Sequence, residues 1–397
     1  MILTVKRAAK TFAAVAIPAS LMIAGAATAA ASPAGARHES QLTVRQVLNG
    51  MKLHHKYIPA GSTKPKTEPL TGPDDLTSIA LNLFTAFQNG VGSQGEPSTD
   101  GNTDSTVVEF GVGGQEIHQW DLKGKCDGLT ADPATGVVIA TVNEDGNSSL
   151  YTISPASPVA TAIQHYTYNK PLPHFGGTDA ISVDNGQILV SASAPGTTGG
   201  QPPPQPTYPA VYKVSLNSST HVATVTPLYF DEATATIANF GSMHGQRVKL
   251  GLTDPDSSAV VPSWVPRFGG QFELTSQADK EQIYAKQSQN SAGLKLQVLK
   301  LSQSVDDTAW AFGAPEILFA TDAASDTVDT VTGDFTRNAI FTAVTPCDAG
   351  NAPSTCPAPG FPPNYLGVLN PFTGHITKAA LTGPNLQPKG LMFVAQP

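Results

Sequence analysis

The sequence is poor in charge and lacks the short motifs that mark the common enzyme families. Lys, Arg, Asp and Glu make up 14 % of its 397 residues, against about a quarter in ordinary soluble domains. The net charge of -8 argues against a nucleic-acid partner, which would need a basic stripe. HxxxH, CxxC, GxSxG and phosphate-cradling glycine motifs are absent. Zinc proteases, α/β-hydrolases and nucleotide-dependent enzymes are therefore disfavoured.

Long hydrophobic runs are also scarce, and the one that exists lies near the N-terminus. Positive charges within residues 6–10 precede an apolar run over residues 11–25, and small residues follow. This order predicts a Sec signal peptide and export from the cell, with a retained membrane anchor as the alternative. We expect no transmembrane segment in the secreted protein. The predicted boundaries are 1–31 for the signal peptide, 32–40 for a flexible segment and 41–397 for a single folded domain.

Cysteine is rare, with three residues in the whole chain. Cys347 and Cys356 flank a segment rich in Pro, Gly and Asn, and outside the cell we expect them to form a disulfide. Cys126 has no evident partner. We interpret it as a small buried hydrophobic residue at the start of a strand.

A repeat of about fifty residues accounts for what the sequence does contain. An Asp recurs before short stretches of small and branched residues, at intervals of 52, 52, 77 and 51 residues. A period near fifty, together with 36 Gly and 33 Pro, predicts an all-β fold of the β-propeller type. Residues 231–251 account for the one long interval. The repeated residues are Asp75, Asp127, Asp179, Asp256 and Asp307.

Four strands per repeat, separated by Gly or Pro turns, fit one propeller blade. Residues 316–322 are predicted as the second strand of the Asp307 repeat. Lys389 takes the place of the Asp before a final apolar strand, and residues 43–57 are predicted as outer strands. Pairing of the N- and C-terminal strands would close the ring and remove its open edges. We expect six blades; seven stay open because residues 326–346 are not assigned.

Several segments resemble a group of secreted bacterial propellers whose activity is not established. The resemblance covers the chain from about residue 41 to its end. More distantly, the sequence is similar to streptogramin-lyase, NHL-repeat and gluconolactonase-like propellers, some of which bind a divalent cation in the channel. No catalytic residue of these relatives can be matched here. The segments that carry the resemblance are GKCDGLTADPATG, NEDGNSSLY, FGGTDAISV, LVSASAPG, LTDPDS, VDDTAW and PKGLMFV.

The repeated Asp residues are the sharpest candidate site. In a propeller, the first strand of each blade lines the central channel, so these side chains should converge on one axis, with Lys389 in the sixth position. Carboxylates crowded around a channel must be protonated, paired or neutralised. A Ca²⁺ ion, which takes six to eight oxygen ligands, would do so. The alternative is architectural, since an Asp at a strand entry often accepts backbone N–H bonds.

Two histidines are weaker candidates, and two functional classes stay open. His174 and His244 lie in segments that we expect on the loop-rich face, where a His could act as a base. Together with Lys389 they are the catalytic candidates. We favour a secreted, monomeric protein that binds a small molecule, glycan or peptide on that face. The alternative is an extracellular metal-assisted lyase or hydrolase acting on a small lactone, ester or saccharide.

Overall fold

The computed structural model describes residues 41–173, 177–195, 207–287, 293–346 and 363–396. All of them belong to one compact unit, Ser40–Pro397. The predicted signal peptide, His174 and the Cys347–Cys356 pair lie outside the described residues, so export and the disulfide stay predictions. Within the described part of the chain, no helix is long and apolar enough to cross a membrane.

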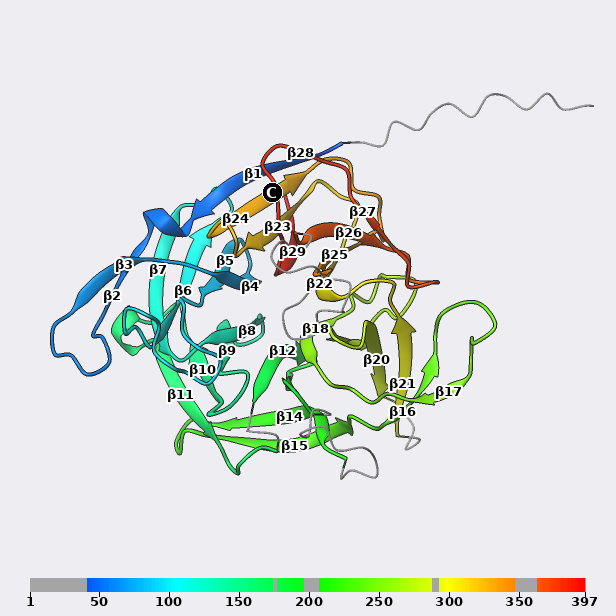
Figure 1. Ribbon diagram of the computed structural model, residues 1–397, viewed down its shortest axis with the longest axis horizontal. Coiled ribbons are helices and arrows are strands. Elements are labelled where there is room, and N and C mark those ends of the chain that lie inside the picture. Colours follow the sequence, from blue (N-terminus) through cyan, green and yellow to red (C-terminus); the bar gives the residue numbers. More distant parts are fainter. Residues whose placement is uncertain (1–40, 174–176, 196–206, 288–292, 347–362, 397) are drawn as a thin grey trace, which may run out of the picture. The chain divides into compact units, whose positions relative to one another are not determined.

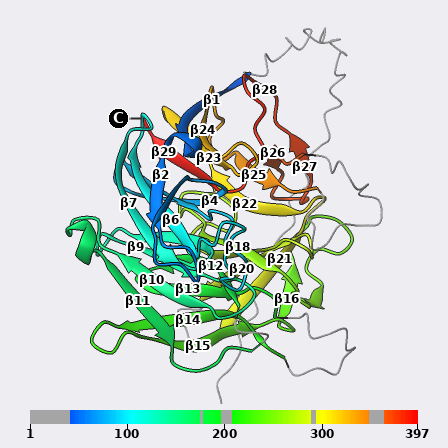
Figure 2. The same ribbon diagram turned by 60° about the vertical axis from the view of Figure 1, so that its left-hand side comes forward.

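The innermost strands of successive sheets follow one another around a ring (Figures 1 and 2). Each contacts the next, and the last contacts the first. Sheets arranged radially around a central channel define a β-propeller, and the fold class predicted from the repeat is confirmed. The innermost strands among the described residues are β4 (Pro73–Ile79), β8 (Cys126–Asp132), β12 (Thr178–Asp184), β18 (Pro255–Val260), β22 (Val305–Trp310) and β29 (Leu391–Ala395).

The first three blades follow the chain in simple up-and-down order. A short parallel ladder between their outer strands joins the second and third blades into one eight-stranded sheet. The strands outside β4 are β5 (Asn82–Phe87), β6 (Asp104–Gly111) and β7 (Glu116–Lys123). Those outside β8 are β9 (Val137–Val142), β10 (Ser149–Ile153) and β11 (Ile163–Tyr168). Those outside β12 are β13 (Gln187–Ala192), β14 (Pro209–Asn217) and β15 (Val222–Phe230).

The fourth blade is widened by the long interval of the repeat. Residues 231–251 contribute two strands that extend the sheet at its outer edge, so the added length does not reach the channel. The order outward from β18 is β19 (Phe272–Ser276), β20 (Glu281–Gln287), β21 (Leu294–Lys300), β16 (Thr234–Ile237) and β17 (Arg247–Lys249).

The last two blades are interleaved along the chain, which corrects one prediction. Glu316–Asp322 (β23) pairs with β29, so it belongs to the closing blade and not to the Asp307 blade. The partner of β22 is instead β25 (Ile340–Val344), followed outward by β26 (Tyr365–Leu369) and β27 (Ile376–Lys378). The chain leaves β22, builds two strands of the next blade and then returns.

The closing blade contains both ends of the described chain. Outward from β29 it holds β23, β24 (Thr327–Thr332), β1 (Leu42–Asn49) and β28 (Leu381–Thr382). The N- and C-terminal strands thus share a sheet as predicted, but β23 and β24 lie between them. A separate hairpin of β2 (His54–Tyr57) and β3 (Lys66–Pro69) and two short 3-10 helices, Gly50–Lys52 and Val159–Thr161, complete the described elements.

The core lies between the faces of neighbouring blades. Between the first two blades, Phe84 and Trp120 pack against Cys126, Val142 and other buried side chains of the second blade. Cys126 is fully buried, which confirms its interpretation as a core residue. This apolar packing leaves the polar groups of the innermost strands to face the channel.

Candidate functional site

The repeated acidic residues mark β-bulges. In β4, β8, β12, β18 and β22, the register with the partner strand shifts where the acidic residues lie. In β8, for example, the shift falls between Cys126 and Leu129. A bulge inserts one extra residue and re-aims its side chain. The bulges therefore turn these acidic side chains toward the channel.

Alignment on the bulges corrects the predicted ring by one residue at two positions. Asp75 and Asp307 occupy the second bulge position, where other blades carry Gly128, Ala180 and Gly390. Their predecessors are the true equivalents of Asp127, Asp179 and Asp256. We call the resulting set the acidic ring: Asp74, Asp127, Asp179, Asp256 and Asp306, with Lys389 in the sixth position.

Asp75 and Asp307 instead link neighbouring blades. Asp75 Oδ2 accepts the backbone N–H of Leu129 at 2.9 Å, and Asp307 Oδ2 accepts that of Leu391 at 2.6 Å. The architectural interpretation therefore applies to these two residues, although the amide of Leu129 or Leu391 belongs to the next blade rather than their own. A carboxylate that accepts backbone N–H groups favours its charged form, which opposes the effect of burial on its pKa.

Where the second bulge residue is not Asp, a hydroxyl makes the link. Thr141 accepts the N–H of Gly128 at 3.1 Å and donates to the carbonyl of Asp179 at 2.5 Å. Thr321 joins Gly390 and Asp74 in the same way. Ser191 donates to the carbonyl of Pro255, and Ser257 to that of Asp306. Within the described residues, every junction between successive innermost strands thus has one such bond.

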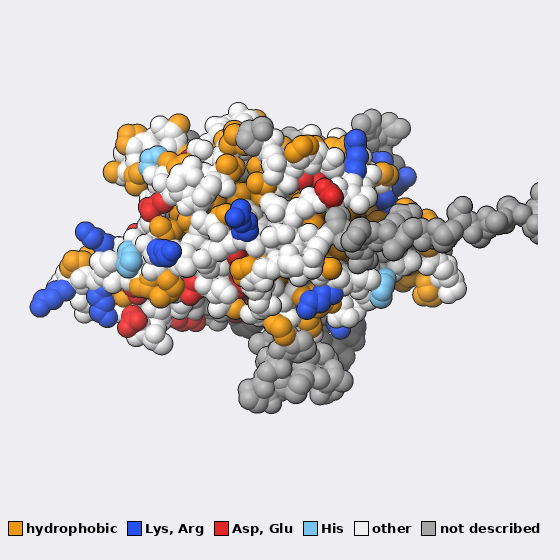
Figure 3. All heavy atoms as spheres, turned by 90° about the horizontal axis from the view of Figure 1, so that it is seen from above, with side chains coloured by type: hydrophobic (Ala, Val, Ile, Leu, Met, Phe, Trp, Pro, Cys, Tyr) orange, Lys and Arg blue, Asp and Glu red, His pale blue; other side chains and the backbone are white. Residues whose placement is uncertain are grey.

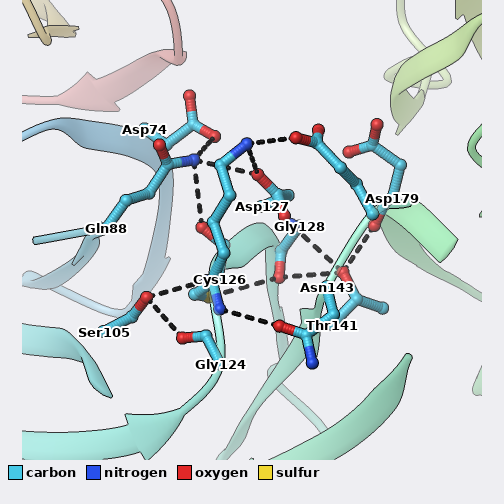
Figure 4. Close-up of polar contacts among 12 residues, drawn as sticks. Asp74, Gln88, Ser105, Gly124, Cys126, Asp127, Gly128, Thr141, Asn143 and Asp179 are labelled. Carbon is cyan, nitrogen blue, oxygen red and sulfur yellow. Dashed lines mark hydrogen bonds and ion pairs between the residues drawn. The ribbon is translucent and has the colours of Figure 1, made fainter. Parts of the chain in front are cut away.

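One half of the acidic ring is neutralised by the chain's own groups. Lys389 Nζ lies 2.8 Å from Asp74 Oδ1, and Lys125 Nζ lies 2.8 Å from Asp127 Oδ1 and also pairs with Glu144. Figure 4 shows the amide of Gln88 between Asp74 and Asp127, at 2.7 and 2.9 Å from their carboxylate oxygens. Burial would lower the pKa of Lys389, but Asp74 and Asp306 raise it well above its ordinary value. Lys389 therefore serves as a counter-ion to Asp74, and its catalytic role stays a prediction.

The other half, at Asp179 and Asp256, has no cationic partner among the described residues. The Asp179 side chain forms neither a hydrogen bond nor an ion pair there, although the residue is only 6 % exposed. In Figure 4 its carboxylate lies on the same side of the strands as those of Asp74 and Asp127, with no dashed contact. Asp256 accepts one hydrogen bond, from the amide of Gln277 at 3.1 Å.

Burial and mutual repulsion raise the pKa values of these carboxyl groups. The pKa of Asp179 is raised well above its ordinary value by burial and by the charges of Glu144 and Asp127, which outweigh the attraction of Lys125. Burial and Asp306 act in the same way on Asp256. Burial raises the pKa of Asp127 to about 8 and that of Asp307 to about 7. The ring therefore takes up protons readily and would gain from an added positive charge.

A cavity of about 210 Å³ adjoins the ring along the axis, and every innermost strand contributes to its wall. Asp75 and Asp307 lie at its boundary, and hydroxyl groups of Thr77, Thr130 and Ser182 line its side. Pockets for drug-sized ligands usually measure about 300–1,000 Å³. This channel suits a ligand of few atoms.

The structure bears on the predicted metal site and on His244. In the described part of the chain, no group of three or more His, Cys, Asp or Glu side chains is placed to hold a metal ion. The ammonium of Lys125 already lies against Asp127 and Glu144, where a divalent ion would have to bind. A calcium ion in the channel stays a prediction. His244 lies in the hairpin between β16 and β17, the outermost strands of the fourth blade, so it is not part of the channel site.

Several residues of the site were not among those predicted from the sequence. The sequence predicted the second Asp of each doublet instead of Asp74 and Asp306. Lys125 has no counterpart in the other repeats. Gln88 is matched by Gln277 of the fourth blade, whose amide bonds to Asp256. Glu144 follows a strand in a polar turn, a pattern equally typical of a solvated loop. The sequence feature that could have identified Asp74 and Asp306 is that each is the first of two consecutive Asp residues. The first Asp of each pair directly follows the last residue that is in regular register before the bulge.

Comparison with known proteins identifies no family and finds distant structural likenesses to other proteins. No model of a protein family matches the sequence, and no curated protein matches it significantly. Similar solved structures include the periplasmic gluconolactonase PpgL of Pseudomonas aeruginosa, with 13 % identity, 90 % of this chain and 99 % of that chain covered, and a TM-score of 0.43. The β-propeller domain of Cps50 (Swd1) from Myceliophteria thermophila has 11 % identity, coverages of 84 % and 80 %, and a TM-score of 0.40. A functionally unknown protein from Desulfotomaculum acetoxidans has 10 % identity, coverages of 90 % and 99 %, and a TM-score of 0.42.

The chain is a β-propeller, and this assignment rests on its strand pairing. A gluconolactonase is among the similar structures, as the sequence resemblance predicts. At such identities and TM-scores, these likenesses carry no argument about what the chain binds or transforms. On the face seen in Figure 3, Lys and Arg side chains lie in small groups separated by uncharged atoms.

Proposed function

We propose that this chain is a ligand-binding β-propeller whose site is the mouth of the channel at the acidic ring, and that its ligand is a small molecule carrying a protonated amine. The observation that supports this proposal is the buried carboxylate of Asp179, which has no partner among the described residues. Because an unpaired buried charge costs several kcal/mol, burial and the charges of Glu144 and Asp127 raise the pKa of Asp179 well above its ordinary value. A ligand that supplies a cation would favour the charged carboxylate and recover part of that cost on binding.

The chemistry of the open half of the ring favours an organic ammonium over a metal ion. Asp179 and Asp256 supply two carboxylates, whereas Ca²⁺ takes six to eight oxygen ligands. An ammonium group has three N–H donors, which two carboxylates and a neighbouring carbonyl can accept. Lys125 and Lys389 show that ammonium groups fit the other half of the same ring. The cavity of about 210 Å³ leaves room for a short chain attached to the amine.

The test compares charged and uncharged probes of equal length. We expect the wild-type protein to bind 1,4-diaminobutane, measured by titration calorimetry at pH 7.5, and not to bind 1,4-butanediol. Asp179→Asn should weaken the affinity about tenfold to a hundredfold, since it removes a charge-assisted interaction of about 1.5–3 kcal/mol. Asp184→Asn, on the same strand but outside the ring, should leave the affinity unchanged.

Three results would contradict the proposal. One is equal binding of diamine and diol, and another is an Asp179→Asn variant with wild-type affinity. The third is no binding by any diaminoalkane of three to five carbons or by butylamine. Because Asp179→Asn removes a buried carboxyl group whose side chain has no partner among the described residues, its free energy of unfolding should equal or exceed that of the wild type, so lost binding would not reflect lost folding.

Catalysis is a second candidate, supported by the pKa values of two channel groups. Burial raises the pKa of Asp127 to about 8 and that of Asp307 to about 7, close to the pH at which a general acid works well. In this case the protein would be a lyase or hydrolase of small lactones, esters or saccharides, with a metal ion such as Ca²⁺ assisting. We would then expect turnover of a lactone, ester or uronic-acid oligomer that is lost in Asp127→Asn and in EDTA. Turnover that survives Asp127→Asn would place the reaction elsewhere.

A further inference from the structure

A buried histidine joins the N-terminal hairpin to the first blade. His55 is 3 % exposed, and both of its ring nitrogens face carboxylates. Nδ1 lies 3.3 Å from Asp121 Oδ1 on β7. Nε2 lies 3.1 Å from Glu68 Oε1 on β3 and, in a longer contact, 3.5 Å from the amide nitrogen of Asn102. We call His55, Asp121 and Glu68 the His55 clasp.

The clasp is complete only when His55 is protonated. A neutral imidazole carries one N–H, so one of its nitrogens would present a lone pair to a carboxylate, which repels it in a buried site. The imidazolium donates to both Asp121 and Glu68. Burial lowers the pKa of His55, but its hydrogen bonds to Asp121 and Glu68 and the charges of these two carboxylates raise it by more, and the net shift is upward.

Other groups around the clasp act in the same direction or leave it unchanged. The ring of Tyr57, on the same strand as His55, stacks on the imidazole at 5.3 Å between centroids. Burial, together with the hydrogen bond to Glu68 and its charge, raises the pKa of the Tyr57 hydroxyl to about 12, so this group is neutral near pH 7. On β6, burial raises the pKa of Asp104, and His55 attracts its charged form. The titratable groups facing His55 are thus carboxyls and a neutral phenol.

The hairpin that carries the clasp also holds the loop between β5 and β6, residues 88–103. The N–H of Ala60 bonds to the carbonyl of Gly101 at 2.8 Å, and Lys66 Nζ donates to the carbonyl of Asp100 at 3.2 Å. A cavity of about 330 Å³ lies between β3 and this loop. Both of these hydrogen bonds between the hairpin and the loop would break if the hairpin moved away from the blade.

The far side of loop 88–103 supports the segment that carries Glu144. The N–H of Asp145 bonds to the carbonyl of Ser93 at 3.0 Å, and Asn147 Nδ2 donates to the carbonyl of Gln94 at 3.4 Å. Glu144 is adjacent to these contacts and pairs with Lys125 at the acidic ring. Hydrogen bonds and chain connections thus run from the hairpin through loop 88–103 to the mouth of the channel.

We propose that the His55 clasp is a pH-sensitive latch that fixes loop 88–103 and, through it, the position of Glu144 at the acidic ring; its effect on ligand affinity rests on the function proposed above. Because protonated His55 is more stable in the folded state, the latch is closed at mildly acidic pH. It opens as the pH rises through the raised pKa of His55. The acidic ring is then held less firmly on the side of Lys125.

The latch is tested by hydrogen exchange of the full chain, corrected for the intrinsic pH dependence of exchange. We expect peptides covering 88–103 and 143–148 to be protected about tenfold more at pH 6.0 than at pH 8.0 in the wild type, the effect of losing one charge-assisted hydrogen bond. His55→Gln should show the lower protection at both values. His54→Gln, the exposed neighbour, should behave as the wild type. Protection that ignores pH, or a His55→Gln variant indistinguishable from the wild type, overturns the latch.

A second measurement uses only the wild-type protein, so it decides the proposal even if His55→Gln does not fold. In isotope-labelled wild-type protein at pH 6.0, the His55 ring should carry protons on both nitrogens; a neutral ring overturns the proposal. The functional arm compares the affinity for 1,4-diaminobutane between variants at one pH, because the ring carboxyls titrate over the same range. Wild type should exceed His55→Gln at pH 6.0 and equal it at pH 8.0; equal affinities at pH 6.0 would disprove the coupling. If the wild type binds no diamine at either pH, the proposed function fails while the exchange data still decide the latch.

Discussion

Replacing Lys125 with methionine is expected to lower the free energy of unfolding by about 3 kcal/mol at pH 9, the low end of the cost of breaking a buried ion pair. The Lys125 side chain is 17 % exposed and touches Asp127, whose side chain is 4 % exposed. Methionine fills a similar volume but leaves Asp127 and Glu144 with no cation. Gln88 donates to Asp127, but an amide cannot neutralise the charge.

The loss should be roughly halved at pH 6, and the pKa values give the direction. Burial would lower the pKa of Lys125, but Asp127 and Glu144 raise it. A lysine whose pKa is raised on folding stabilises the protein fully below its unfolded pKa of about 10.4, so Lys125 is charged at both pH values. Burial raises the pKa of Asp127 to about 8, so at pH 6 this group is protonated and needs no cation. At pH 6 only the pair with Glu144 is lost.

Urea denaturation at the two pH values measures both free energies. Lys123→Met, an exposed lysine two residues earlier, is the matched control and should change stability little. Combining Lys125→Met with Asp127→Asn should recover much of the loss at pH 9, because the uncompensated charge is gone. A double variant as unstable as the single one, or a loss independent of pH, would show that Lys125 contributes packing and not charge.

The fold class could be predicted from the sequence because five of the described innermost strands carry the same bulge. Each of these bulges contains an Asp, which therefore recurs about every fifty residues. The pairing of Glu316–Asp322 could not be predicted in the same way. Its apolar pattern fits the second strand of either adjacent blade, and the choice depends on how the chain ends meet in the ring.

The sequence predicted Asp75 and Asp307 as members of the acidic ring, whereas the structure places their predecessors, Asp74 and Asp306, in it. In Asp74-Asp75 and Asp306-Asp307, either Asp fits the repeat, and the local sequence does not say which one faces the axis. The bulge geometry decides it: a Cβ at Gly128 would lie 2.3 Å from the carbonyl oxygen of Asp179, so the second position faces the next blade. At Asp75 and Asp307 that position links blades and does not join the ring.

The His55 clasp gives no signal in the sequence. Its partners, Glu68 and Asp121, are 13 and 66 residues away, and neither spacing matches a turn, a helix or a metal site. His54 and His55 are equivalent by pattern in a short strand. Only the packing of the hairpin against β7 buries His55 and leaves His54 exposed.

Replacing Thr141 with valine is expected to lower the free energy of unfolding by about 3 kcal/mol, because it leaves two buried backbone groups without partners at about 1–3 kcal/mol each. The hydroxyl accepts the N–H of Gly128 and donates to the carbonyl of Asp179. It is the side-chain link between the second and third blades at the bulge. Since that carbonyl belongs to the residue with the unpaired carboxylate, the affinity for 1,4-diaminobutane should fall as well.

Thr85→Val is the matched control for the same substitution in a buried second strand. Thr85 is fully buried, and its hydroxyl has no partner among the described residues, so valine should leave the stability unchanged or raise it slightly. Thermal and urea unfolding of both variants measure the contrast. Equal losses in Thr141→Val and Thr85→Val would mean that the cost comes from the substitution itself and that the hydroxyl links do not hold the blades together. A loss confined to Thr141→Val would instead show that the ring is assembled from such links, and that the position of Asp179 depends on the second blade.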